Sequence, residues 1–250
     1  MRTKTVFITG SSRGIGRACA LRFAAAGYHV FINCKKSIGD LKITENEITQ
    51  NGGSCTSLTG DVANPDDVRR IFHEIERICS GLNDGDKHLD VLVNNAGVAY
   101  IGLLTDMSDA DWDHILSANL SSAFYCCRAA IPAMVSAKKG KIINISSMWG
   151  TGGASCEAAY SAAKSGLHGL TKALGKELAP SNIQVNAIAC GVIDTAMNNQ
   201  LTETEKKELE YEIPAGRFAS PKEVAELVFD LSQKHTYLTS QIIGFDGGFL

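Results

Sequence analysis

Short apolar runs alternate with stretches of helical periodicity along the whole chain. The runs lack the in–out alternation of a half-exposed strand, so we expect strands that are covered on both faces, as in a parallel sheet. Helical periodicity is clearest from Val68 to Ile78 and from Val224 to Leu231. The runs that we expect to form strands are TVFIT (5–9), HVFIN (29–33), GSCTSL (53–58), VLVN (91–94), KIINI (141–145), IQVNAI (183–188) and QIIGF (241–245).

This alternation predicts βαβ units and therefore an α/β fold. We expect one domain over residues 1–250, built on a doubly wound sheet of about seven parallel strands with helices on both faces. No linker, repeat or low-complexity segment divides the sequence. The stretches most typical of loops are residues 80–88 and the region from Cys190 to about Leu201.

The composition excludes several classes of protein. With 44% hydrophobic and 20% charged residues, the chain can bury a large core. Its net charge of −3 offers no basic excess to nucleic acid or to an anionic membrane. The first apolar run is too short for an export signal, and no run of about 18 apolar residues follows. We therefore expect a soluble, cytoplasmic protein.

Cysteine and histidine spacing gives no sign of a disulfide framework or of a metal site. The eight cysteines include no CxxC pair, and we expect them to be reduced. The six histidines include no HExxH motif and no pair at helical spacing, so we expect no bound metal.

The stretch TGSSRGIG (9–16) directly follows the first expected strand and opens a helix. Glycines in this pattern allow a tight turn and a close backbone approach to a ligand. The free N–H groups at the start of the helix attract a diphosphate. On the first strand-to-helix turn of an α/β chain, the motif predicts a dinucleotide site of the Rossmann type. The residues that we expect at this turn are Gly10, Ser12, Arg13, Gly14, Ile15 and Gly16.

The second expected strand ends without the acidic residue that binds a ribose 2′-hydroxyl. The sequence there reads NCKKS (33–37), and Lys35 and Lys36 can face a 2′-phosphate together with Arg13 of the glycine turn. We therefore expect NADP(H) rather than NAD(H) as the cofactor. The alternative is that the two lysines are solvated loop charges.

The motif YSAAK (160–164) puts Tyr160 and Lys164 on one face of an expected helix. A free tyrosine has a pKa near 10, which is too high for efficient proton exchange at neutral pH. An ammonium at ~4 Å favours the phenolate by about 4 kcal/mol at an effective dielectric constant near 20. We therefore expect Lys164 to lower the pKa of Tyr160 and the two to form a proton-transferring pair. The alternative is that both side chains are solvated on an outer face.

Further motifs lie where expected strands end, which is where an open parallel sheet binds its ligand. NNAG (94–97) ends the fourth strand and INISSMWG (143–150) the fifth, and Asn119 lies in a helix between them. With TGxxxGxG and YxxxK, these motifs resemble those of the short-chain dehydrogenase/reductase family over essentially the full chain. Within it, the chain is most similar to the 3-oxoacyl-[acyl-carrier-protein] reductases, in GSSRGIGRA, DVLVNNAG, NLSSAF, IPAGRFASPKEVA and GFDGGF.

The resemblance implies NADPH-dependent reduction of a ketone to a secondary alcohol. It implies that Tyr160 donates the proton, that Lys164 assists it and binds the nicotinamide ribose, and that Ser147 hydrogen-bonds the substrate carbonyl. Asn119 would link the lysine to solvent. The remaining cofactor contacts that it implies are Asp61 and Val62 at the adenine, Asn95, Ala96 and Gly97 along the groove, and Ile193 and Thr195 at the carboxamide.

The substrate stays open between two classes. One is a 3-oxoacyl thioester on an acidic acyl carrier protein, for which the docking region is only partly basic: Arg128, Lys138, Lys139, Lys172 and Lys176. The other is a free small molecule such as a hydroxysteroid, a polyol or an aromatic ketone. Met148 and Trp149 offer apolar pocket surface to either class, and we expect residues 192–216 to form a lid.

Cys190 stands where many relatives have proline, and we expect it to be a small packing residue rather than a reactive thiol. The resemblance also implies a homotetramer. A cofactor-sensing protein that has lost its chemistry is a third possibility, but such a protein need not keep Tyr160, Lys164, Ser147 and Asn119 together.

Overall fold

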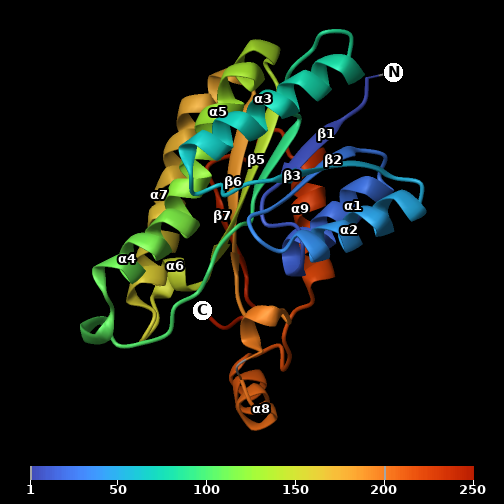
Figure 1. Ribbon diagram of the computed structural model, residues 1–250. Coiled ribbons are helices and arrows are strands. Elements are labelled where there is room, and N and C mark those ends of the chain that lie inside the picture. Colours follow the sequence, from blue (N-terminus) through green and yellow to red (C-terminus); the bar gives the residue numbers. More distant parts are fainter. Residues whose placement is uncertain (1, 200) are drawn as a thin grey trace.

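Parallel strands form the centre of the molecule. Residues 2–199 and 201–250 are described by a computed structural model (Figure 1), and within them seven strands form one sheet. The strands are β1 (Thr5–Ile8), β2 (His29–Cys34), β3 (Ser54–Thr59), β4 (Val91–Asn94), β5 (Gly140–Ser147), β6 (Ile183–Cys190) and β7 (Ile242–Phe245). Their order is β3-β2-β1-β4-β5-β6-β7, and every neighbouring pair is parallel. The expected fold class is confirmed.

Helices cover both faces of the sheet (Figure 1). One face packs against α1 (Gly14–Ala25), α2 (Ile38–Gln50) and α9 (Pro221–Gln233), and the other against α3 (Pro65–Leu82), α5 (Ser122–Ala137) and α7 (Ala158–Leu178). The other helical segments are η1 (Leu104–Asp106), α4 (Asp109–Leu116), η2 (Ser117–Ser121), α6 (Trp149–Gly152), η3 (Ala179–Ser181), η4 (Ala196–Asn198) and α8 (Glu203–Glu212).

The two cores explain why the strand sequences are apolar throughout. On β1, Val6 and Ile8 face the core with α1 and α9, whereas Phe7 between them faces the core with α3 and α5. All three side chains are fully buried. A strand with both faces covered needs apolar residues at successive positions, which is the pattern that predicted the parallel sheet.

The strand order fixes where a ligand can bind. Crossovers from β1 run to one side of the sheet, toward β2 and β3, and crossovers from β4 run to the other. The loops after β1 and β4 therefore diverge at the carboxyl edge of the sheet, which is where a parallel sheet of this kind typically binds its ligand. Helix α8, which belongs to the segment expected to form a lid, extends beyond this edge (Figure 1).

Two local expectations need correction, and the structure adds a detail to a third segment. Residues 80–82 belong to the end of α3 rather than to a loop. Asn119 lies in the π-helical turn η2 rather than in a regular helix. The expected lid contains its own helix, α8, whose N-terminus is a capping box between Thr202 and Glu205; within the lid, Gln200 lies outside the described residues.

A buried ion-pair network ties the start of the chain to the loop before β4. Asp90 is only 5% exposed and accepts hydrogen bonds from Arg2 Nη1 at 2.7 Å and from the Thr5 backbone N–H at 2.9 Å. Burial alone would raise the pKa of Asp90, but hydrogen bonds from His88, Arg2 and Thr5 outweigh it and hold the pKa well below its usual range. A carboxylate whose pKa is depressed in the folded state stabilises the fold at every pH at which it is ionised.

We expect Asp90→Asn to lower the free energy of unfolding by about 2 kcal/mol at pH 7, because it leaves Arg2 without its buried counter-charge. As the pH falls below about 4, the wild type loses the same contribution, so the difference must shrink. Urea denaturation at pH 7 and at acid pH measures it. Asp66→Asn, at an exposed pair with Arg69, is the control and should have a small effect. A difference that stays constant with pH would contradict the assignment.

Candidate active site

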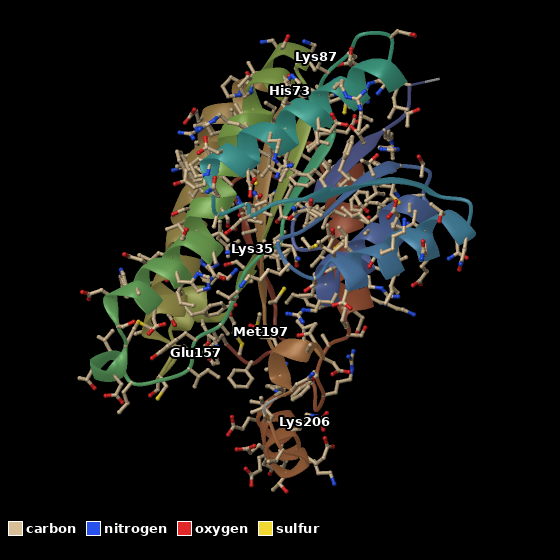
Figure 2. All side chains as sticks on the ribbon, viewed as in Figure 1. Lys35, His73, Lys87, Glu157, Met197 and Lys206 are labelled. Atoms are coloured by element: carbon tan, nitrogen blue, oxygen red, sulfur yellow. The ribbon has the colours of Figure 1, made fainter. Side chains whose placement is uncertain are left out.

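Most of the motifs singled out in the sequence meet at the carboxyl edge of the sheet. The glycine turn follows β1, NNAG ends β4, Ser147 ends β5, and Ile193 follows β6. Lys35, Glu157 and Met197 come from three different parts of the chain and lie around the same edge (Figure 2). The parallel direction of the strands is what brings these distant segments together.

The glycine turn has the shape of a phosphate cradle. Gly10 and Gly14 have φ angles of 62° and 56°, which side-chain-bearing residues rarely adopt. A Cβ atom on Gly16 would lie 2.4 Å from the carbonyl oxygen of Gly10, so no larger residue fits there. Helix α1 begins after Arg13 without a side-chain cap. Its first-turn N–H groups therefore fit a diphosphate.

Two residues that the sequence analysis missed hold this turn. Thr9 Oγ1 accepts the backbone N–H groups of Asn95 and Ala96, each at 2.9 Å, and joins the glycine turn to the end of β4. The backbone carbonyl of the buried Asn33 accepts the Ser11 N–H at 2.9 Å, and the Asn33 N–H donates to Ser11 Oγ at 2.7 Å. Their only sequence signal was position: Thr9 precedes the first glycine of the motif, and Asn33 is a polar residue inside an apolar strand.

The residues expected on the adenosine side are only partly free to bind an anion. Lys35 Nζ forms an ion pair with Asp61 at 2.5 Å, whereas Arg13 and Lys36 are exposed and make no ion pair within the described residues. Val62 is buried beside Asp61. A 2′-phosphate would therefore meet two free cations and one that is already neutralised.

The segment after β6 closes over the glycine turn. Ile193 is buried and pairs with Ala219, and a Cβ atom on Gly14 would lie 3.4 Å from Thr195 Cγ2. Thr195 and Gly14 thus face each other, as expected for two residues that line one cofactor groove.

Tyr160, Lys164 and Ser147 lie close together where the end of β5 meets α7. On α7, Tyr160 is half-buried and Lys164 is 4% exposed, and Lys164 Nζ lies 5.5 Å from the centre of the Tyr160 ring. Lys164 Nζ donates a hydrogen bond to the Ile145 carbonyl of β5 at 3.0 Å. Ser147 ends β5, is 7% exposed, and accepts the backbone N–H of Trp149 at 3.2 Å. The alternative of a solvated outer face is therefore wrong.

The electrostatics differ from the expectation. Burial raises the pKa of Tyr160 well above its ordinary value; the Ser147 hydroxyl acts in the opposite direction, and Glu157 adds to the rise. Burial also lowers the pKa of Lys164 to about 8. The expectation that Lys164 lowers the pKa of Tyr160 is therefore wrong for this arrangement, because desolvation dominates and Lys164 is not among the groups that shift the pKa of the phenol.

Asn119 connects this centre to the end of β4. It is 2% exposed, and its Nδ2 donates to the carbonyls of Val98 at 2.9 Å and Ile115 at 3.0 Å. A Cβ atom on Gly97 would lie 2.6 Å from Asn119 Oδ1 and 3.6 Å from Lys164 Nζ. Gly97 thus lets the amide and the ammonium approach the groove wall together. The π-helical turn points the Asn119 side chain inward and lets it bond the Ile115 carbonyl.

The substrate side has one apolar wall and one titratable group. Met148 is 3% exposed, whereas Trp149 is half-exposed and stacks edge-on against Phe249 at 5.7 Å, so Trp149 offers the larger apolar surface. Glu157 precedes α7, is half-buried, and makes no ion pair among residues 2–199 and 201–250. Burial raises the pKa of its carboxyl.

Cys190 and the other cysteines behave as packing residues. Cys190 is 5% exposed within the core, and burial raises the pKa of its thiol to about 12, so it stays protonated. All eight cysteines are free. In the described part of the chain, no group of His, Cys, Asp and Glu side chains is arranged to hold a metal ion, and no helix is long and apolar enough to cross a membrane.

Comparison with known proteins gives the site a family context. The sequence model of the family described as short chain dehydrogenase matches residues 4–206. An uncharacterized oxidoreductase, YmfI, of Bacillus subtilis (strain 168) is 37% identical over 98% of both chains. The 3-oxoacyl-[acyl-carrier-protein] reductase FabG of Staphylococcus aureus (strain Mu50) is also 37% identical over 98% of both chains.

A solved structure has the same fold. The crystal structure of a putative gluconate dehydrogenase from Agrobacterium tumefaciens superposes with a TM-score of 0.92 at 32% identity, covering 99% of this chain and 96% of that one.

We expect Lys164→Met to raise the free energy of unfolding by about 1–3 kcal/mol at pH 7, because the fold disfavours the charged ammonium. A lysine with a depressed pKa binds fewer protons in the folded state, so wild-type stability rises between about pH 8 and pH 10. The advantage of the variant must therefore shrink over that range. Thermal melts of both proteins test this, with the exposed Lys172→Met as control. A variant no more stable than the wild type at pH 7 would refute it.

Proposed function

This chain belongs to the short-chain dehydrogenase family, and we propose that it reduces a ketone to a secondary alcohol with NADPH, most readily a 3-oxoacyl thioester. The observation that supports this proposal is the meeting of Ser147, Tyr160 and Lys164 beside the glycine turn. A hydroxyl donor, a phenol and an ammonium around one opening suit proton transfer to a carbonyl oxygen.

Each residue has a role that follows from its state in the structure. Tyr160 is protonated at neutral pH, and burial raises its pKa further, which makes the proton harder to release. It can still give that proton to the carbonyl oxygen, because hydride addition turns this oxygen into an alkoxide, which is a stronger base than a phenolate. The Ser147 hydroxyl donates a hydrogen bond to the same oxygen and stabilises the developing charge. A reduced nicotinamide bound at this groove would supply the hydride that the carbonyl carbon takes up. The ammonium of Lys164 has three N–H groups. One donates to the Ile145 carbonyl, so two remain for the phenol oxygen and a ribose hydroxyl.

Asn119 supports the return of the proton. Its side chain bridges η2 and the segment after β4, directly beside Lys164 Nζ across Gly97. The amide of Asn119 does not titrate, so it provides a polar group near Lys164 without taking up the proton itself. We propose that it organises the path by which Lys164 exchanges protons with solvent.

The choice of NADPH rests on charge. Within the described residues, Arg13 and Lys36 are exposed and unpaired, and β2 ends without an acidic side chain. A 2′-phosphate gains charge-assisted hydrogen bonds from such cations. Asp61 neutralises Lys35, so we assign the larger part of the phosphate recognition to Arg13 and Lys36.

The carrier-protein partner has weaker support than the thioester itself. Arg128 stacks on Phe124, with its guanidinium 4.9 Å from the ring centre, and Lys139 forms an ion pair with Asp90 at 3.1 Å. Two of the five basic residues expected to dock an acidic carrier are therefore engaged within the chain. The exposed Phe124 and Trp112 also support assembly through this surface, as in the proposed homotetramer.

Glu157 favours a second candidate function. An unpaired, half-buried carboxylate close enough to raise the pKa of Tyr160 gains a partner from a substrate that brings hydroxyl groups. A polyhydroxy keto acid is such a substrate, and the similar solved structure is a putative gluconate dehydrogenase. An acyl chain, in contrast, would use the apolar wall at Trp149.

We expect Tyr160→Phe to lower kcat at least 10²-fold to 10³-fold with an acetoacetyl thioester and NADPH, because it removes the proton donor without changing the shape of the ring. The matched control is Tyr125→Phe on α5, whose hydroxyl has no partner within the described residues and whose activity should be unchanged. Oxidation of NADPH followed by absorbance measures both.

The same assay with a cyclic ketone and a polyhydroxy keto acid decides the substrate. A kcat/KM at least tenfold higher for the thioester supports the proposal, whereas a tenfold advantage for the keto acid replaces it with the second candidate. Tight NADPH binding without turnover of any ketone would instead support a sensing protein.

We expect kcat/KM to be at least tenfold higher with NADPH than with NADH. Lys36→Glu should reduce the NADPH value about tenfold or more and leave the NADH value nearly unchanged, because only NADPH has the 2′-phosphate. Lys42→Glu on α2, where Lys42 pairs with Glu45, is the control for net charge. A tenfold or greater preference for NADH would reverse the assignment.

A further inference from the structure

A histidine continues the catalytic face of α7. His168 lies four residues after Lys164 and eight after Tyr160, so the three side chains occupy successive turns of one helix face. It is 7% exposed, and its Nε2 lies 2.8 Å from the hydroxyl oxygen of Ser146 on β5. Ser146 directly precedes Ser147 and is itself 3% exposed. The ring is therefore held next to a catalytic residue without reaching the cofactor groove.

The same ring also supports the residues that follow Ser147. A Cβ atom on Gly150 would lie 2.7 Å from His168 Cε1, so α6 rests directly on the imidazole. One residue earlier, the Trp149 backbone N–H donates to Ser147 Oγ. His168 thus contacts the chain on both sides of Ser147, by a hydrogen bond before it and by close packing after it.

Contacts on neighbouring turns show why such a restraint matters. Lys164 bonds the Ile145 carbonyl, and Thr171 Oγ1 accepts Asn144 Nδ2 at 2.8 Å. Apolar helix–sheet contacts alone tolerate sliding, whereas buried polar contacts fix one register. The His168–Ser146 contact is the one in this series that adjoins Ser147.

The charge state of the ring fits this role. Burial, together with the positive charges of Lys172 and Lys164, lowers the pKa of His168, so the imidazole is neutral at neutral pH. Among the residues packed against it, Ser146 and Gly150 are uncharged, and the nearby cations both lie on α7. A neutral ring makes a hydrogen bond without adding a charge beside Lys164.

We propose that His168 is a positioning residue that holds Ser147 against Tyr160, through its hydrogen bond to Ser146 and its contact with Gly150. The inference rests on the proposed function only in that Ser147 and Tyr160 act on the substrate. Nothing in it depends on which carbonyl compound is reduced.

Three variants test this. We expect His168→Leu to lower kcat about 10-fold to 100-fold while the KM for the carbonyl substrate and the Kd for NADPH change less than about twofold. Ser146→Ala, which leaves the ring in place, should lower kcat in the same direction. Combining the two should cost little more than His168→Leu alone, because both remove one contact. His168→Gln, with a polar end group, should restore most of the activity.

Thr171→Val is the matched control, because it removes the neighbouring polar contact of α7 with β5 at a point remote from Ser147. We expect it to lower the Tm while leaving kcat within about twofold of the wild type. If His168→Leu and Thr171→Val both lower only the Tm and leave kcat unchanged, His168 is merely structural and the proposal is wrong. If His168→Leu does not fold, the Ser146→Ala variant provides the test: a lowered kcat supports the positioning role, and an unchanged kcat contradicts it.

A measurement without turnover separates this inference from the proposed function. In protein with isotope-labelled tyrosine, the Tyr160 ring signal is assigned by its loss in Tyr160→Phe. We expect that signal to shift in His168→Leu and Ser146→Ala but not in Thr171→Val. If the wild type reduces no ketone but the signal shifts as expected, the proposed function fails and the positioning role stands. An unshifted signal overturns the positioning role whatever the activity.

Discussion

The burial of the Lys164 ammonium is the constraint around which the rest of the site is arranged. A charged group that is 4% exposed, with the Ile145 carbonyl as its hydrogen-bond acceptor, costs free energy that the two apolar cores must offset. The small residues Ala159 and Ala163 are buried against Ile115, so that α4 and α7 pack closely on the side of α7 next to Lys164. The buried charge lowers the stability of the fold at this point, as is common at sites where a function requires a destabilising group.

The site joins two halves of the sheet that have different tasks. The β1–β3 half supplies the glycine turn, and the β4–β6 half supplies Ser147, Tyr160 and Lys164. Thr9 connects them, because its hydroxyl accepts two N–H groups from the end of β4. A displacement of either half would therefore move the phosphate cradle relative to the proton donor. Such a link explains how a groove lined by distant segments keeps one geometry.

Sequence reasoning located the strands, and it singled out Tyr160 and Lys164, which the fold buries together, because both features leave periodic or closely spaced patterns. The sequence-based prediction ended β5 and β6 too early. Ser147 and Cys190 lie beyond the apolar runs of these two strands, but they still pair with each other in the sheet. It gave the wrong direction for the pKa of Tyr160, because helical spacing brings two side chains together but says nothing of how much water surrounds them. The Lys35–Asp61 pair joins segments 26 positions apart (61 − 35), which no local pattern reveals.

The π-helical turn at Ser117–Ser121 has a consequence for how this protein can vary. A π-helical turn takes one residue more than an α-helical turn, and it absorbs that residue locally instead of rotating the helix that follows. The face of α5 that carries Cys126 and Met134 therefore stays in the core despite the additional residue before it. Removing one residue from this turn would close it into an α-helical turn, which would displace the buried Asn119 more than it would disturb the packing of α5.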